Sequence, residues 1–211
     1  MKKTFLALAV ILLHNILLSQ SVFNIRYTLP YVYSGTNNII PADSGYFITA
    51  FTPPTIYFMD NANNFTLIKQ YTNTSGFGPL RRTTDNYLIS ASTAQVGGVY
   101  EWTYLMKFDN TFDTIFMKNY SYDSLGNAET ILFDSFESTD GYYILLGSES
   151  KDSNGIYFPN YYSNGWFIKV DTTGILIRSK TIGSNSNYDW FNSGLQMGSY
   201  YYFVGTTRSR S

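Results

Sequence analysis

The chain has 211 residues, of which 44% are hydrophobic and 14% are charged, so it can bury a core and is not a charge-rich disordered chain. Its formal net charge of −1 includes Lys2 and Lys3 at the N-terminus, and this balance argues against nucleic acid as a partner, because phosphate binding depends on clustered Lys and Arg. The sequence has no Cys, and its one His, His14, lies in an N-terminal apolar stretch; for the rest of the chain this excludes Ser-His-Asp and Cys-His nucleophile systems, His- or Cys-ligated metal sites and disulfides.

Residues 1–20 have the pattern of a secretory signal peptide. Lys2 and Lys3 precede a nearly unbroken apolar stretch from Phe5 to Leu18. We therefore predict a signal peptide that is cleaved on export, a mature domain at 21–211, and a secreted or cell-surface location.

A membrane anchor is the alternative interpretation of this apolar stretch. His14 and Asn15 interrupt it, and its length falls short of the roughly 20 residues that a helix needs to span a bilayer. No later apolar run is long enough for a spanning helix. We therefore expect no stable membrane insertion, and the export machinery as a transient partner.

One short phrase occurs four times and indicates a repeat. Each copy has turn-forming residues followed by a run rich in Tyr, Ile, Leu or Phe, which favours a turn that leads into a half-buried strand. The four copies are Ser44–Ala50, Asp85–Ala91, Asp140–Gly147 and Gly198–Gly205.

A second phrase follows the first three copies and ends each time on an aspartate. A few turn residues and another alternating run come after it, which is the pattern of a β-hairpin. We expect Asp60, Asp109 and Asp171 to form turns rather than to bind metal or to catalyse. The runs are Ile56–Asp60 with Phe65–Tyr71, Tyr104–Asp109 with Phe112–Tyr120, and Trp166–Asp171 with Ile175–Ile182.

A further candidate strand precedes each copy of the first phrase: Asn38–Ala42, Gly78–Thr83, Glu129–Ser138 and Phe191–Met197. Each repeat thus has four short strands, A to D in chain order, and recurs about every 40 to 60 residues, which is typical of a β-propeller blade. We predict an all-β fold of four-stranded antiparallel, β-propeller-like blades, about three and a half of them. A β-sandwich is the alternative, but it does not explain the fourfold phrase.

The phrases resemble those of secreted, propeller-like repeat proteins of Bacteroidetes. The best match lies at 140–190, where Gly147-Ser148 and the run from Trp166 to Gly174 follow the blade pattern of that group. The resemblance implies a cargo of the type IX secretion system, and its motifs make the fold without a catalytic signature. Because the sequence stops after strand B of the fourth copy, we expect it to be the N-terminal part of a longer propeller.

The loops between strands B and C lengthen along the chain, and the longest carries several aromatic side chains. Loops that grow on one side of a regular scaffold often carry function. We therefore predict a ligand-binding site in this aromatic loop, although packing against the blade is an alternative role. The predicted residues are Tyr157, Phe158, Asn160, Tyr161 and Tyr162.

The predicted function is that of an exported, non-catalytic scaffold that binds a carbohydrate or a surface protein through the B–C loop face. We expect no enzyme activity, no catalytic residue, no cofactor and no metal. Asp152 to Gly155 resembles part of a calcium loop but lacks the rest of its acidic pattern, so we expect a plain turn. The alternatives are a carboxylate-dependent glycosidase or lyase and a purely structural surface cargo.

Overall fold

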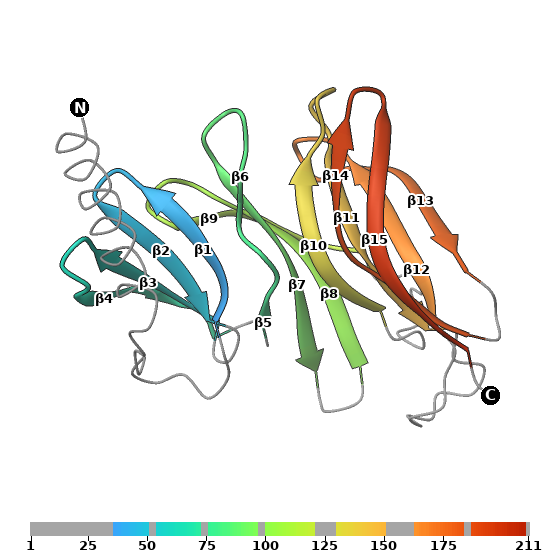
Figure 1. Ribbon diagram of the computed structural model, residues 1–211, viewed down its shortest axis with the longest axis horizontal. Helices are drawn as coiled ribbons and strands as arrows, with labels where there is room; N and C mark the ends of the chain where they lie inside the picture. The colour runs from blue at the N-terminus through green and yellow to red at the C-terminus, as the bar shows by residue number, and fades with distance from the viewer. Residues whose placement is uncertain are drawn as a thin grey trace, which may run out of the picture. The chain divides into compact units, whose positions relative to one another are not determined.

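The structure is a computed structural model, and it describes residues 36–50, 54–72, 76–96, 100–120, 130–150, 163–183 and 187–209. Within these ranges every regular element is a β-strand (Figure 1). None of the described residues belongs to a helix that is long and apolar enough to cross a membrane.

The strands form three antiparallel sheets and a final hairpin, in chain order. The first sheet is β1 (Thr36–Ala42), β2 (Gly45–Ala50), β3 (Thr55–Asp60) and β4 (Phe65–Gln70); the second is β5 (Gly76–Phe77), β6 (Arg81–Arg82), β7 (Leu88–Val96), β8 (Tyr100–Phe108) and β9 (Thr114–Asn119). The third is β10 (Thr130–Glu137), β11 (Tyr143–Ser150), β12 (Ser163–Val170) and β13 (Leu176–Ile182); the hairpin is β14 (Asn187–Met197) and β15 (Tyr200–Ser209).

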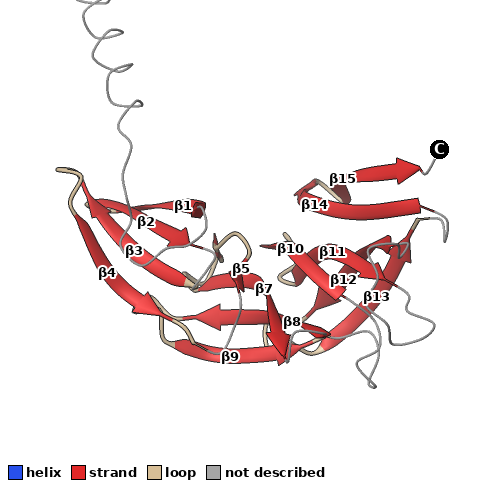
Figure 2. Cartoon of the chain, turned by 90° about the horizontal axis from the view of Figure 1, so that it is seen from below, coloured by secondary structure: helices blue, strands red, loops and turns tan. Residues whose placement is uncertain are grey.

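Each sheet connects neighbouring strands through hairpins, so its strands lie in chain order. Figure 2 shows the sheets as successive layers, with the β14–β15 hairpin as the next layer beyond β10–β13. A single parallel pair, Ser163 with Tyr188, joins the hairpin to the third sheet. These are the β-propeller-like blades that the repeats predict: three four-stranded units and the first two strands of a fourth.

One predicted strand is broken in the structure. The sequence predicts an uninterrupted strand at Gly78–Thr83, but the chain pairs with β7 only at β5 and β6, on either side of a gap. Pro79 lies in that gap and has no N–H to donate to the ladder. Gly78 still donates its N–H to the carbonyl of Ala91, 2.6 Å away, so the segment stays beside β7.

The first strands of the third and fourth repeats, β10 and β14, are irregular in their N-terminal halves. The register shifts between Leu132 and Asp134 in β10, and between Phe191 and Ser193 in β14. Gly147 on β11 lies opposite the first of these bulges, and a Cβ there would overlap the carbonyl oxygen of Ile131. The glycine of the Gly-Ser phrase thus serves the close approach of two backbones.

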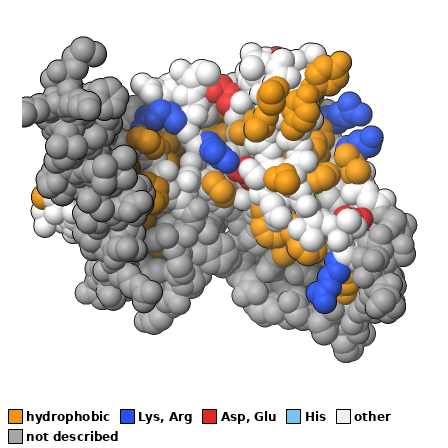
Figure 3. All heavy atoms as spheres, in the orientation of Figure 1, with side chains coloured by type: hydrophobic (Ala, Val, Ile, Leu, Met, Phe, Trp, Pro, Cys, Tyr) orange, Lys and Arg blue, Asp and Glu red, His pale blue; other side chains and the backbone are white. Residues whose placement is uncertain are grey.

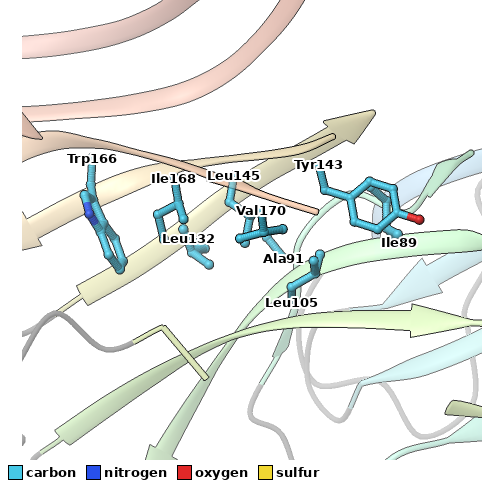
Figure 4. Close-up of a cluster of buried hydrophobic side chains, with 9 residues drawn as sticks. All are labelled: Ile89, Ala91, Leu105, Leu132, Tyr143, Leu145, Trp166, Ile168 and Val170. Atoms are coloured by element: carbon cyan, nitrogen blue, oxygen red, sulfur yellow. The ribbon is translucent and has the colours of Figure 1, made fainter. Parts of the chain in front are cut away.

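The hydrophobic core lies between the sheets, in layers. The second sheet has apolar side chains on both faces, and so does the third, because each is packed between two neighbours. This arrangement contradicts the β-sandwich alternative, in which each of two sheets buries one face. The layer between the first and second sheets is Ile40, Ile56, Leu80, Leu88, Tyr104, Met106, Phe108 and Phe112. The next is Ile89, Ala91, Leu105, Leu132, Tyr143, Leu145, Trp166, Ile168 and Val170 (Figure 4); the third is Ile144, Leu146 and Phe167.

Candidate functional site

The aromatic loop that the sequence singles out lies outside the described residues. All of Tyr157, Phe158, Asn160, Tyr161 and Tyr162 fall there, as does the segment from Asp152 to Gly155. Their role as a binding site stays a prediction. Among the described residues, no group of three or more His, Cys, Asp or Glu side chains is placed to hold a metal ion.

The repeated aspartates form turns, as predicted. Asp171 Oδ1 accepts hydrogen bonds from the backbone N–H groups of Thr173 and Ile175, at 2.9 and 2.8 Å. Asp60 and Asp109 accept the equivalent bonds in their own turns. Backbone and hydroxyl donors lower the pKa of the Asp171 carboxyl, so it is ionised and engaged near neutral pH.

A pocket of about 480 Å³ opens between the second and third sheets. The end of β9, the faces of β12 and β13 that turn toward β9, and the turn between β12 and β13 form its walls. This volume lies within the range of small-molecule sites in proteins. We call it the inter-sheet pocket; its lining residues are Lys118, Asn119, Tyr120, Trp166, Ile168, Gly174, Leu176 and Ser179.

The turn at Gly174 differs from its counterpart in the second sheet. Asp109 and Asp171 begin equivalent turns, and the residues three positions on, Phe112 and Gly174, both have positive φ, +62° and +82°. Phe112 points into the layer between the first and second sheets, where it is 1% exposed and its ring centroid lies 4.7 Å from that of Phe47. Gly174 has no side chain to fill the equivalent space. A Cβ there would lie 2.8 Å from Lys118 Cγ, so the lysine stem occupies that side of the pocket.

Hydrogen bonds hold two aromatic residues in the pocket wall. Tyr120 donates its hydroxyl to the Gly174 carbonyl at 2.7 Å, and Trp166 donates its indole N–H to Ser179 Oγ at 2.8 Å. Burial, helped by the charge of Asp171, raises the pKa of Tyr120, so its hydroxyl stays protonated. Ser179 uses an acceptor site for the indole and keeps its own O–H as a donor.

Polar contacts between the first strands of successive repeats form a second cluster. Asp134 is fully buried and receives Nη2 of Arg81 at 3.2 Å and the hydroxyl of Ser193 at 2.5 Å. These residues come from β10, β6 and β14, so the carboxylate bridges three repeats. Nearby, Glu137 accepts the N–H of Thr84 at 2.5 Å. Both carboxylates are occupied in holding repeats together, which is a structural role.

A lysine on strand C makes a repeated cross-sheet contact. Lys107 donates to Asp85 at 3.1 Å within its own sheet and to the hydroxyl of Tyr143, on the third sheet, at 2.7 Å. Burial alone would lower the pKa of Lys107, but these two partners raise it above its usual value. Lys169 repeats the pattern, with Asp140 of its own sheet at 2.7 Å and the ring centroid of Tyr201, on the β14–β15 hairpin, at 6.0 Å.

The inter-sheet pocket was not among the sites predicted from the sequence. The sequence does carry a signal for it, because Gly174 aligns with Phe112 and changes a large side chain to none at a turn that faces the next sheet. Reading the repeats against each other by side-chain volume finds that position, whereas a search for catalytic or metal motifs does not.

No protein-family model matches this sequence, and no curated protein sequence matches it. Among solved structures the chain is similar to that of an endo-arabinase from Bacteroides thetaiotaomicron VPI-5482, with 12% sequence identity, a TM-score of 0.48, and coverage of 89% of this chain and 80% of that one. At this identity the likeness concerns the fold alone.

The prediction that the chain is not an enzyme is wrong as a conclusion from the sequence. The similar structure is that of an endo-arabinase. The prediction depended on the missing His and Cys, and glycoside hydrolysis needs neither, because two carboxyl groups do its chemistry. The sequence has 15 Asp and Glu residues, so the absent residue types exclude no such reaction.

Proposed function

We propose that this chain is a carbohydrate-directed protein and that the inter-sheet pocket holds one or two sugar units. The observation that carries the proposal is the make-up of that pocket. Sugars present both apolar C–H faces and many hydroxyl groups. A site for them therefore combines flat apolar surface with fixed donors and acceptors.

Both kinds of surface meet in the pocket. Leu176 is 53% exposed and supplies the accessible apolar wall, whereas Trp166 and Ile168 are 2% and 0% exposed in the empty pocket. Lys118, Asn119 and Ser179 supply an ammonium, an amide and a hydroxyl. Hydrogen bonds already fix Trp166 and Tyr120, so part of the wall is pre-ordered and loses little freedom when a ligand binds. A purely apolar ligand would displace water from the exposed Lys118 ammonium without replacing its hydrogen bonds, at a cost in free energy.

Binding to a panel of soluble polysaccharides, linear arabinan, xylan, mannan and β-glucan, tests the proposal. Calorimetry on the full chain should find saturable binding to at least one of them. Lys118→Met keeps the stem beside Gly174 and removes the ammonium, so it should weaken that binding about tenfold. Lys69→Met is the matched control, because Lys69 has the same position at the end of β4 and faces no described pocket; it should leave binding unchanged.

Two outcomes contradict the proposal: no binding to any member of the panel, or equal loss of binding in both variants. The glycosidase alternative is decided in the same samples. New reducing ends after incubation would make the chain a carboxylate-dependent glycosidase, while new unsaturated ends would make it a lyase. Binding to the B–C loop face instead would leave the Lys118→Met variant at full affinity.

A further inference from the structure

The interfaces between successive sheets repeat the same contacts, so residues at equivalent positions can be compared. At each interface a tyrosine donates its hydroxyl to a carbonyl in a turn of the next sheet. The pairs are Tyr71 with Phe112, at 2.6 Å, and Tyr120 with Gly174, at 2.7 Å. The residue after each of these carbonyls donates its N–H to the aspartate that begins the turn. These residues are Asp113, at 2.9 Å, and Ile175, at 2.8 Å, and they are therefore equivalent.

A lysine near the end of the outer strand occurs at both interfaces, but its partner does not. Lys69 and Lys118 each lie two residues before the tyrosine of their interface. Lys69 forms an ion pair with Asp113. At the next interface Ile175 stands where that acid would be, and no ion pair joins Lys118 to another described residue.

The turn that lacks the acid also lacks the large side chain. Phe112 is 1% exposed between the first and second sheets, whereas Gly174 lines the inter-sheet pocket. The stem of Lys118 passes beside Gly174, and its ammonium is exposed. Ser179, on the β13 side of the pocket, keeps its O–H as a donor because its oxygen accepts the indole N–H. A lysine with no acidic partner among the described residues thus borders a cavity of about 480 Å³.

Asp171 is the acidic residue that begins this turn, and its own turn engages it. The backbone N–H of Ile175 and the hydroxyl of Thr173 lower the pKa of the Asp171 carboxyl. At the first interface the equivalent Asp109 has its pKa lowered by such donors too, and by the charge of Lys69 in addition. Donors within the turn therefore satisfy Asp171 without the Lys118 ammonium.

We infer that the sugar unit in the inter-sheet pocket is anionic and that its single negative charge pairs with the Lys118 ammonium. This inference rests on the proposed function and names the class of sugar. The carboxylate of a uronate and the sulfate ester of a sulfated sugar are both acceptor groups, which suit the two donors of Lys118 and Ser179. A hydrogen bond between charged groups is about twice as strong as one between neutral groups.

The chain as a whole does not attract anions, so the preference depends on the pocket. Its formal net charge is −1. On the face that Figure 3 shows, the basic and acidic side chains of the described residues are scattered rather than gathered into one basic patch. A general electrostatic attraction would need such a patch.

Two matched pairs of oligosaccharides test the inference by calorimetry on the full chain. One pair is tetragalacturonate and its methyl ester, and the other is a sulfated galactan tetrasaccharide and its desulfated form. In at least one pair the charged form should bind at least tenfold more tightly than the neutral form. The pair that shows this preference identifies the charged group as a carboxylate or as a sulfate.

Variants assign the preference to Lys118. Lys118→Met should bind the charged and neutral forms with equal affinity, because it lacks the ammonium that distinguishes them. Ile175→Asp supplies the acid of the first interface at a residue that is 60% exposed, and it should reduce the preference to less than threefold. Lys69→Met and Leu67→Asp make the same charge changes on β4 of the first sheet and should keep the tenfold preference.

The outcomes separate this inference from the proposed function. Equal binding of the charged and neutral forms by the wild type would overturn the inference and leave the proposed function standing. So would a tenfold preference that survives in Lys118→Met or in Ile175→Asp. Binding of neither form would also overturn the inference, and the panel of neutral polysaccharides would then decide the proposed function separately.

Discussion

The interface between the first and second sheets is filled, whereas the interface between the second and third is hollow near its outer strands. Phe112 projects from its turn into the first interface and contacts Phe47. At the second, the equivalent residue is Gly174, which projects no side chain and lines the inter-sheet pocket. Polar contacts cross both interfaces. At the first they join Asn38 to Leu80, Tyr71 to Phe112 and Lys69 to Asp113. At the second they join Arg81 to Asp134, Thr84 to Glu137 and Lys107 to Tyr143. A repeat can thus hold a cavity although apolar packing and hydrogen bonds both join it to its neighbour.

The largest loss in free energy of unfolding should come from removing a buried side chain at the interface between the first and second sheets. Phe112→Gly removes a buried ring and leaves a cavity, which costs about 4 kcal/mol in similar cases. Glycine also relieves the positive φ of this position, a gain of about 1 kcal/mol. We therefore expect the free energy of unfolding to fall by about 3 kcal/mol, measured by urea denaturation. A loss below about 1 kcal/mol would mean that Phe112 does not hold the first two sheets together.

Removing a hydrogen-bond donor at the interface between the second and third sheets should lower the free energy of unfolding by less. Lys107→Met keeps the aliphatic stem but leaves the buried Tyr143 hydroxyl and the Asp85 carboxylate without this donor, so we expect a loss of about 2 kcal/mol in urea denaturation. Lys69→Met is the control at the filled interface, where Lys69 meets the exposed Asp113. Exposed pairs contribute about 0.5 kcal/mol or less, so equal losses in the two variants would contradict the comparison.

The smallest effect should be a loss of stability at low pH, when the Asp85 carboxylate beside Lys107 becomes protonated. Burial would raise the pKa of Asp85, but the Thr83 hydroxyl and Lys107 outweigh it and lower that pKa below its usual value. The contribution of the Asp85 carboxylate to stability is therefore present above its ordinary pKa of about 3.9 and is lost as pH falls through the lower folded value. The difference between the urea midpoints of the wild type and Asp85→Asn should shrink as pH falls from 6 toward 3. A difference that is independent of pH would show that the charge of Asp85 has no such role.

Much of the fold could be predicted from the sequence because each strand is short and bounded by turn residues. The phrase from Asp140 to Gly147 places a turn and a strand by local chemistry alone, although β11 is buried at every residue rather than half-buried. Asp171 closes its turn within five residues. The break at Pro79 was missed because alternation suggested a strand while the missing N–H excluded one.

The candidate site was harder to predict because it depends on residues far apart in the chain. Lys118 and Ser179 line one pocket although three strands, β10, β11 and β12, lie between them in sequence. Composition does not reveal the pocket either, because Gly174 has the positive φ of an ordinary turn glycine. Only comparison with Phe112 shows that an equivalent turn carries a large side chain.

The tyrosines at the ends of β4 and β9 set the distance between neighbouring sheets. Tyr71 and Tyr120 each fix their backbone N–H to their own sheet, on the carbonyls of Pro54 and Thr103, and reach the next sheet with the hydroxyl. The tyrosine ring is rigid and has a fixed length. The hydrogen bond from its hydroxyl therefore fixes the distance between its own strand and the next sheet. Ile182, at the end of β13, has the equivalent place in the third sheet and has no hydroxyl. Ring packing and hydrogen bonds such as Ser193 to Asp134 join the β14–β15 hairpin to that sheet instead.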